Sequence, residues 1–179
     1  GAVLEVRAPD LTPDGWALTL SNLGATRTIL WEQSRDKRLL SQAIADQEAA
    51  LTVLTRERAP LEWAQAKTRL GNALCALGEQ SGDERLLSQA IADQEAALEV
   101  FTPERAPLDW ARTQGNLGTA FLVLGERGDD DALHQAIAAY EAALSKMRQH
   151  NTLTHIALFE NKLARAQAIS RQRKPPPQG

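Results

Sequence analysis

The chain lacks what would cross-link it covalently, anchor it in a bilayer or draw it to nucleic acid. Its one cysteine, Cys75, excludes a disulfide within the chain. No apolar run approaches the roughly 20 residues of a membrane-spanning helix. Its 20 basic and 23 acidic residues give a net charge of -3, so no positive field attracts DNA, RNA or anionic lipid. We expect a cytoplasmic protein that binds neither nucleic acid nor membrane.

Residue groupings that support catalysis or hold cofactors are equally scarce. The three histidines, His134, His150 and His155, are not spaced as a helical metal pair and lie far from Cys75 in sequence. The acidic run 129–131 lacks the alternating ligands of a calcium loop, and capping of a helix start explains it more simply. No glycine-rich phosphate loop occurs. We therefore expect no enzyme, no metal and no cofactor, with Cys75 a small packed or groove residue.

The feature that the chain does have is an internal repeat. Segments 38–53 and 85–100 differ at one position, and they are displaced by 85 − 38 = 47 residues. A third copy at 134–144 is displaced by a further 46 residues. The same offset relates three sets of residues: Trp16, Trp63 and Trp110; Leu23, Leu70 and Leu117; Gly24, Gly71 and Gly118. Recurrence of this kind is typical of stacked helical repeats.

Each period predicts two helices. Pro60 and Pro107 suit the first turn of a helix, where a missing amide hydrogen costs nothing. Apolar residues then follow at helical spacing until Gly78 and Gly125, which we predict to end the helix in a left-handed conformation. A second amphipathic helix follows a polar turn and runs to about Phe101 in the second copy. Each copy is thus predicted to be an antiparallel helical hairpin.

A single hairpin cannot bury both of its faces, so neighbouring hairpins must stack. We predict an all-α fold of three hairpins, at 13–55, 58–102 and 105–149, followed by a capping helix at 152–173. In that helix the apolar positions in register are Ile156, Phe159, Leu163 and Ala164. Segment 1–8 aligns with the end of a second helix, which predicts preceding repeats or a preceding domain; the alternative is an N-terminal extension that merely resembles a helix end. The proline-rich segment 174–179 is predicted to be disordered.

The residues at the hairpin-packing positions resemble the tetratricopeptide repeat signature. The third copy carries it most fully, in Asn116, Leu117, Gly118, Thr119, Ala120, Phe121, Gly125, Ala136, Ile137, Tyr140, Ala143 and Leu144. The resemblance covers nearly the whole chain, although the period exceeds the family's usual length of about 34 residues. Gln47 and Gln94 also replace the aromatic residue found at Tyr140. The resemblance to the tetratricopeptide signature implies a right-handed α-solenoid. Repeats with this long period resemble those of bacterial multidomain proteins.

The resemblance also implies a partner-binding surface on the concave face, formed by the first helix of each hairpin. The variable positions there predict partner-binding residues at Gln65, Thr68, Asn72, Arg112, Thr119, Asn161 and Arg165, with Ser21, Ala25, Cys75 and Leu122 beside them. The alternative is that these are ordinary solvated residues. Some family members clamp a peptide's terminal carboxylate, but Thr68 and Gly115 stand where that clamp needs basic side chains, so it is not predicted.

Three functions are consistent with the sequence. The first is a scaffold that binds a protein or peptide on the concave face. The second is a regulatory or spacer array within a larger signalling or protease-like protein. The third is self-assembly into a homo-oligomer through exposed repeat ends. The recurring tryptophans are predicted to pack between hairpins, whereas Trp31 stands where later copies have Gly78 and Gly125.

Overall fold

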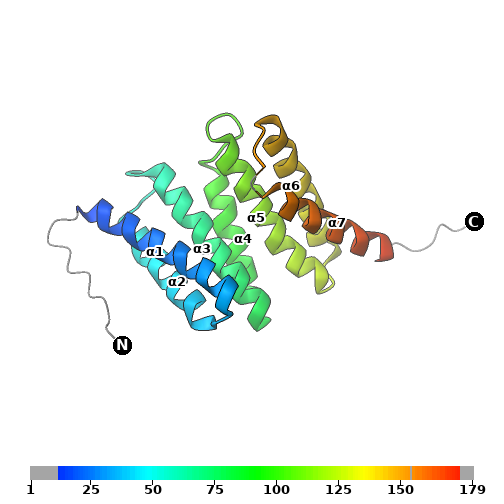
Figure 1. Ribbon diagram of the computed structural model, residues 1–179, viewed down its shortest axis with the longest axis horizontal. Coiled ribbons are helices and arrows are strands. Elements are labelled where there is room, and N and C mark those ends of the chain that lie inside the picture. Colours follow the sequence, from blue (N-terminus) through cyan, green and yellow to red (C-terminus); the bar gives the residue numbers. More distant parts are fainter. Residues whose placement is uncertain (1–11, 154, 174–179) are drawn as a thin grey trace, which may run out of the picture.

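The computed structural model describes residues 12–153 and 155–173, in which all regular structure is α-helical (Figure 1). The helices are α1 (Pro13–Ser34), α2 (Lys37–Leu51), α3 (Pro60–Ser81), α4 (Glu84–Leu98), α5 (Pro107–Glu126), α6 (Asp130–Gln149) and α7 (Ile156–Arg173). The predicted all-α class is confirmed. The segments 1–8 and 174–179, for which a helix end and a disordered tail were predicted, lie outside the described residues.

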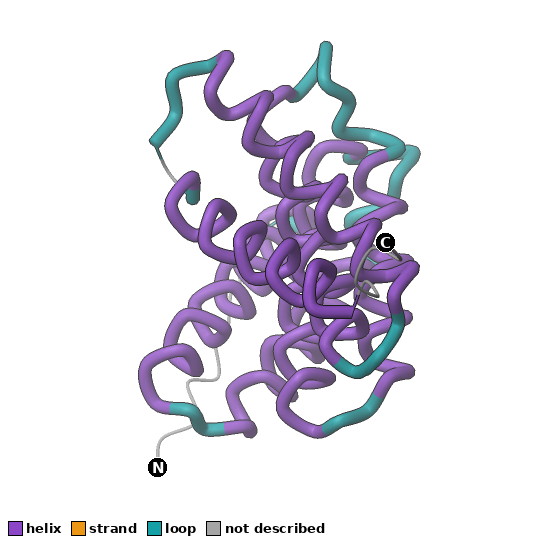
Figure 2. Tube along the Cα trace, turned by 90° about the vertical axis from the view of Figure 1, so that its right-hand side faces the viewer, coloured by secondary structure: helices purple, strands orange, loops and turns teal. Residues whose placement is uncertain are grey.

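The helices follow one another in space in the order of the sequence (Figure 1). The closest pairs are α1 with α2, α3 with α4, and α5 with α6. Short connections join them, as the tube in Figure 2 shows. Contacts also link α1 to α3, α3 to α5 and α5 to α7, whereas α2, α4 and α6 do not contact one another in the described chain. The first helices of the pairs, together with α7, therefore form one connected row.

The starts of the helices follow the sequence signals. Pro60 and Pro107 begin α3 and α5, as predicted. The second helices begin behind aspartates: the Asp36, Asp83 and Asp129 carboxylates accept hydrogen bonds from backbone N–H groups of the first turn. The acidic run at 129–131 therefore caps a helix.

The predicted ends of the first helices are wrong. Helix α3 continues through Gly78 to Ser81, and the left-handed residue is Gly82, with φ 80°. A Cβ at Gly78 would lie 3.0 Å from the Leu87 side chain, so this glycine permits close approach of α3 and α4. Helix α5 likewise passes Gly125 and ends at Glu126. The two glycines are there for packing between helices and do not terminate them.

Two further boundaries differ from the prediction. Helix α4 ends at Leu98, and Phe101 is fully buried in the loop that follows. Helix α7 begins at Ile156, four residues later than predicted, and its Ala164 is exposed while Ala166 is buried. Amphipathic periodicity locates a helix but leaves its ends and its exact rotation open.

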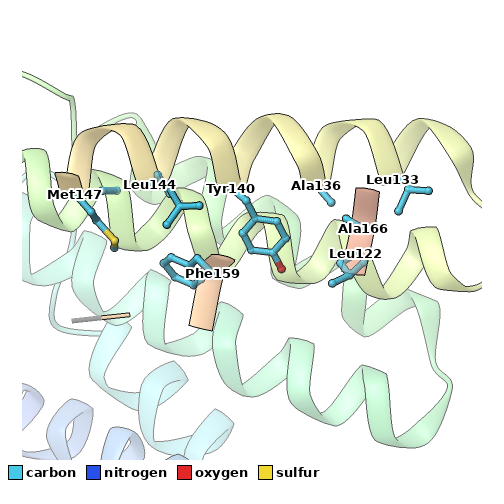
Figure 3. Close-up of a cluster of buried hydrophobic side chains, with 10 residues drawn as sticks. Leu122, Leu133, Ala136, Tyr140, Leu144, Met147, Phe159 and Ala166 are labelled. Atoms are coloured by element: carbon cyan, nitrogen blue, oxygen red, sulfur yellow. The ribbon is translucent and has the colours of Figure 1, made fainter. Parts of the chain in front are cut away.

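The largest cluster of buried side chains joins α5, α6 and α7 (Figure 3). The rings of Tyr140 and Phe159 lie beside each other, with centroids 5.9 Å apart. Phe159 also lies against Gly115, where an added Cβ would come within 2.2 Å of the ring. Phe159 therefore anchors α7 on α5 at a glycine, where any side chain would displace the ring.

Buried glutamines connect the helices of the first two pairs. The Gln47 amide accepts a hydrogen bond from the Ser21 hydroxyl at 2.8 Å and donates one to the Ser21 carbonyl at 2.7 Å. The Gln94 amide donates to the Thr68 carbonyl at 3.1 Å. In the third pair the aligned Tyr140 fills this place. Gln47 and Gln94 thus replace aromatic packing with hydrogen bonds across the pair.

The four tryptophans occupy different environments. Trp63 and Trp110 pack in a cluster with Phe101 between neighbouring pairs, as predicted. Trp16 is 38% exposed on α1. Trp31 is buried, and the Arg35 guanidinium lies over its ring at 5.0 Å. The Trp31 ring fills space at the end of α1. The later copies have Gly78 and Gly125 at this position, and the side chains of Leu87 and Leu133 pack against these glycines.

Candidate functional site

Two adjoining hollows lie where α1, α3, α5 and the α7 region face one another. The first, which we call the arginine hollow, has a volume of about 390 Å³ and is lined by Ala25, Thr28, Ile29, Glu32, Gln65, Thr68, Arg69, Asn72, Arg112 and His155. The second, the lysine hollow, has a volume of about 200 Å³ and is lined by Thr28, Trp31, Glu32, Asn72, Cys75, Ala76, Glu79, Asn116, Thr119, Leu158, Phe159 and Lys162. Three residues are shared, so the two form one continuous surface.

The arginine hollow contains two half-buried guanidinium groups. Arg69 Nη1 donates a hydrogen bond to the Ser21 hydroxyl at 2.8 Å, and Arg112 Nη2 pairs with the Asp109 carboxylate at 2.6 Å. Burial, and then the positive charge of Arg112, lower the pKa of Arg69. No carboxylate of the described residues forms an ion pair with Arg69. Arg69 is therefore a partly desolvated cation whose only side-chain partner among residues 12–153 and 155–173 is a neutral hydroxyl.

Two other ionisable side chains line this hollow. His155 precedes α7 and stacks on Phe159, with ring centroids 5.9 Å apart. Glu32 lies on α1 and is exposed. Because Arg112 already pairs with Asp109, Arg69 is the guanidinium of this hollow that lacks an ion pair among the described residues, and an anionic group beside it would be favoured.

The lysine hollow holds a partly buried chain of hydrogen-bonded polar side chains. Lys162 Nζ donates to the Thr119 hydroxyl at 3.2 Å, and the Tyr140 hydroxyl donates to the same oxygen at 3.1 Å. Burial lowers the pKa of Lys162. Burial also raises the pKa of the Cys75 thiol to about 12. At neutral pH that thiol is protonated, so it is a packed side chain rather than a nucleophile.

Five of the seven predicted partner-binding residues line the hollows. Gln65, Thr68, Asn72 and Arg112 line the arginine hollow, and Thr119 lines the lysine hollow together with Asn72. Thr68 is almost fully buried, and its hydroxyl donates to the Ala64 carbonyl at 3.0 Å. Thr68 therefore belongs to the floor of the hollow rather than to its accessible wall.

The remaining two, Asn161 and Arg165, line neither hollow. Both are exposed on α7, and Arg165 Nε lies 2.5 Å from a carboxylate oxygen of Glu126. Helix α7 instead presents Leu158, Phe159 and Lys162, because its rotation differs from that predicted by the repeat offset. Of the neighbouring positions, Ala25 and Cys75 line the hollows, whereas Ser21 lies buried beneath Arg69 and Leu122 belongs to the core.

The sequence reading missed Arg69 and Lys162. Arg69 aligns with Asn22 in the first copy and Asn116 in the third, so a comparison of the copies shows it as the one basic residue at that position. That contrast was the available signal. Lys162 follows the predicted Asn161 in the sequence, and the rotation of α7 places Lys162 rather than Asn161 at the hollow.

The described chain is thus an all-helical, repeat-like protein with a mixed polar surface where its first helices meet. Its described residues include no cluster of three or more His, Cys, Asp or Glu side chains arranged to hold a metal ion. None of the helices described combines the length and apolar content that crossing a bilayer requires. Comparison with models of protein families, with curated proteins and with solved structures gives no match.

Proposed function

We propose that this chain is a scaffold that binds a protein or peptide segment along α1, α3, α5 and α7, and that the segment places a carboxylate on Arg69. Arg69 itself is the observation that carries the proposal. This half-buried guanidinium loses hydration without gaining an anion from the part of the chain that the structure describes, which is costly unless a partner supplies one. A carboxylate would match the planar guanidinium through charge-assisted hydrogen bonds.

The dimensions of the surface suit a peptide. The arginine hollow alone falls within the range of roughly 300–1,000 Å³ typical of ligand sites, and the lysine hollow extends it toward α7. Polar side chains such as Gln65 and Asn72 supply donors and acceptors for a peptide backbone. With Cys75 protonated and buried, the described surface offers binding groups and no activated nucleophile, which favours binding over catalysis.

We also propose that the helix pairs form a right-handed α-solenoid of the tetratricopeptide kind, with the first helices on its concave side, in a cytoplasmic protein without a cofactor. Support comes from the 47-residue repeat and from the row of contacts through α1, α3, α5 and α7. The absence of contacts among α2, α4 and α6 in the described chain fits a row curved toward the first helices.

The test begins with selection of peptides from a random display library on the immobilised full-length chain. Binding of selected peptides is then measured by fluorescence anisotropy to the wild type, to Arg69→Gln and to Arg38→Ala. We expect enrichment in Asp and Glu, and at least a tenfold loss of affinity in Arg69→Gln, equivalent to about 1.4 kcal/mol.

Arg38 is the matched control because it is a highly exposed arginine on α2 that pairs with Asp36 away from the hollows. Equal effects of the two substitutions would mean that the chain attracts acidic peptides non-specifically. If peptides bind tightly and Arg69→Gln leaves their affinity unchanged, the binding site lies elsewhere. The spacer and self-assembly alternatives stay predictions, and neither requires a carboxylate at Arg69.

A further inference from the structure

An apolar stripe on α1 has no covering element in the described chain. It consists of Trp16, Leu23 and Leu30, which recur every seven residues and are 38%, 41% and 45% exposed. We call this the α1 stripe. Large apolar side chains exposed along one face of a helix are typical of interaction surfaces.

The aligned residues of the later copies are covered. Leu23 corresponds to Leu70 and Leu117 at the 47-residue offset, and these are only 3% and 7% exposed. Leu70 packs in a cluster with Ile44 and Leu51 of α2. The repeat therefore shows what covers this stripe in α3: the second helix of the preceding pair.

The helix that covers α5 matches the one that covers α3. Residues 38–51 of α2 and 85–98 of α4 are identical in sequence. Leu77 of α3 packs with Ile44 of α2, and the aligned Leu124 of α5 shares a cluster with Ile91 of α4. One helical sequence thus packs against leucines of the stripe in both α3 and α5, whereas the aligned Trp63 clusters with Ala97 and Phe101.

We infer that the α1 stripe is a docking surface for an amphipathic helix that carries the apolar residues Ile44 and Leu51 of α2, which recur as Ile91 and Leu98 of α4. Two threonines, Thr19 and Thr26, lie between its apolar residues, and Thr19 aligns with Thr113, which is fully buried in α5. Thr113 lies against Thr68 of α3, with the two hydroxyl oxygens 3.2 Å apart, so a threonine at that position is compatible with burial against a neighbouring helix. The docking surface uses no residue of the two hollows and does not depend on the proposed function.

A second copy of the chain is a poorer occupant than a separate helix. Its helices of matching sequence, α2 and α4, already pack against α3 and α5. Donating either one would open an established interface in the second copy. A separate helix with that sequence pattern could dock on the α1 stripe without any existing interface being opened.

The test uses a fluorescent synthetic peptide of residues 37–54, titrated into the full chain and followed by anisotropy. We expect saturable binding that weakens at least tenfold in Leu23→Glu, and equally when Glu replaces Ile44 and Leu51 in the peptide. Leu108→Glu is the matched control, because Leu108 is 45% exposed at the start of α5, away from the stripe. It should leave binding unchanged.

Short helices are only marginally stable in water, so a tethered form provides a second measurement. A copy of residues 37–59 replaces residues 1–12, because segment 37–59 directly precedes Pro60, which aligns with Pro13. We expect the extended chain to have a higher Tm than the wild type. Leu23→Glu should lower the Tm by several degrees more in the extended chain than in the wild type. Absence of both peptide binding and tethered stabilisation would overturn the inference, as would binding that is insensitive to Leu23→Glu. Self-association of the wild type that Leu23→Glu abolishes, without peptide binding, would also overturn it.

Discussion

At the scale of single residues, the contact between Gly115 and Phe159 decides how α7 is held. Replacing Gly115 with alanine would place its Cβ 2.2 Å from two ring carbons of Phe159, far inside contact distance. Alanine favours a helix by roughly 1 kcal/mol over glycine, but the displaced ring costs more. We expect Gly115→Ala to lower the free energy of unfolding by about 1–3 kcal/mol in urea denaturation.

Phe159→Ala supplies the control for this prediction. Without the ring, the alanine at 115 has room, and Gly115→Ala should become neutral or stabilising in the Phe159→Ala background. An equal loss in both backgrounds would mean that strain within α5, and not the ring, sets the cost.

Lys162 gives a prediction that depends on pH. Its pKa is lowered by burial, so the unfolded chain holds this proton more tightly than the folded chain does. Wild-type stability therefore gains as pH rises through the window between the lowered folded pKa and the unfolded value of 10.5. We expect Lys162→Met to stabilise the fold at pH 7 by roughly 1.4 kcal/mol per unit of that lowering, and the gain to shrink as pH approaches 10.5.

Denaturant titrations of wild type and Lys162→Met at several pH values measure this difference. Lys37→Met on α2 is the comparison substitution, because Lys37 is exposed and its replacement should change stability by no more than about 0.5 kcal/mol. A gain for Lys162→Met that is constant with pH would assign the effect to packing.

At the scale of helices, the buried glutamines determine how a pair is joined. Gln94 donates to the Thr68 carbonyl at 3.1 Å and to the Asn72 side-chain oxygen at 2.9 Å. Gln94→Leu keeps the volume but leaves both acceptors without this donor, which costs about 1–3 kcal/mol in buried surroundings. Thermal and urea unfolding should show that loss, whereas Gln89→Leu, at an exposed position of α4, should change stability by no more than about 0.5 kcal/mol.

The helices also show which signals a sequence carries. Pro60 and Pro107 predicted helix starts correctly, because a proline's missing amide hydrogen and fixed φ act locally. The prediction of a helix end at Gly78 was wrong, because a helical glycine also serves close packing; Gly82, and not Gly78, has the positive φ. Whether a glycine turns the chain or admits a neighbour depends on tertiary contacts that the local sequence does not contain.

At the scale of the whole molecule, the repeat predicted which helices would face one another, but not every residue on their shared surface. Asn72 and Arg112 line the arginine hollow because the offset transfers reliably between complete pairs. The transfer failed for Asn161 on α7, which lacks a following partner helix in the described chain and rotates to seat Phe159 on Gly115. The repeat pattern did not predict Arg69 as a site residue. A partly buried cation is recognised by its surroundings in the fold, and the spacing of residues does not show them.

The central claim is that partner segments bind where α1, α3, α5 and α7 face one another. The most direct test titrates the isotope-labelled full chain with a selected acidic peptide and follows backbone amide and arginine Nε signals by NMR. The largest shifts should fall on Ala25, Asn72 and Arg112 and on the Arg69 side chain, with exposed positions of α4 such as Ser88 unchanged. Shifts confined to α2, α4 and α6, or to the α1 stripe, would contradict the claim.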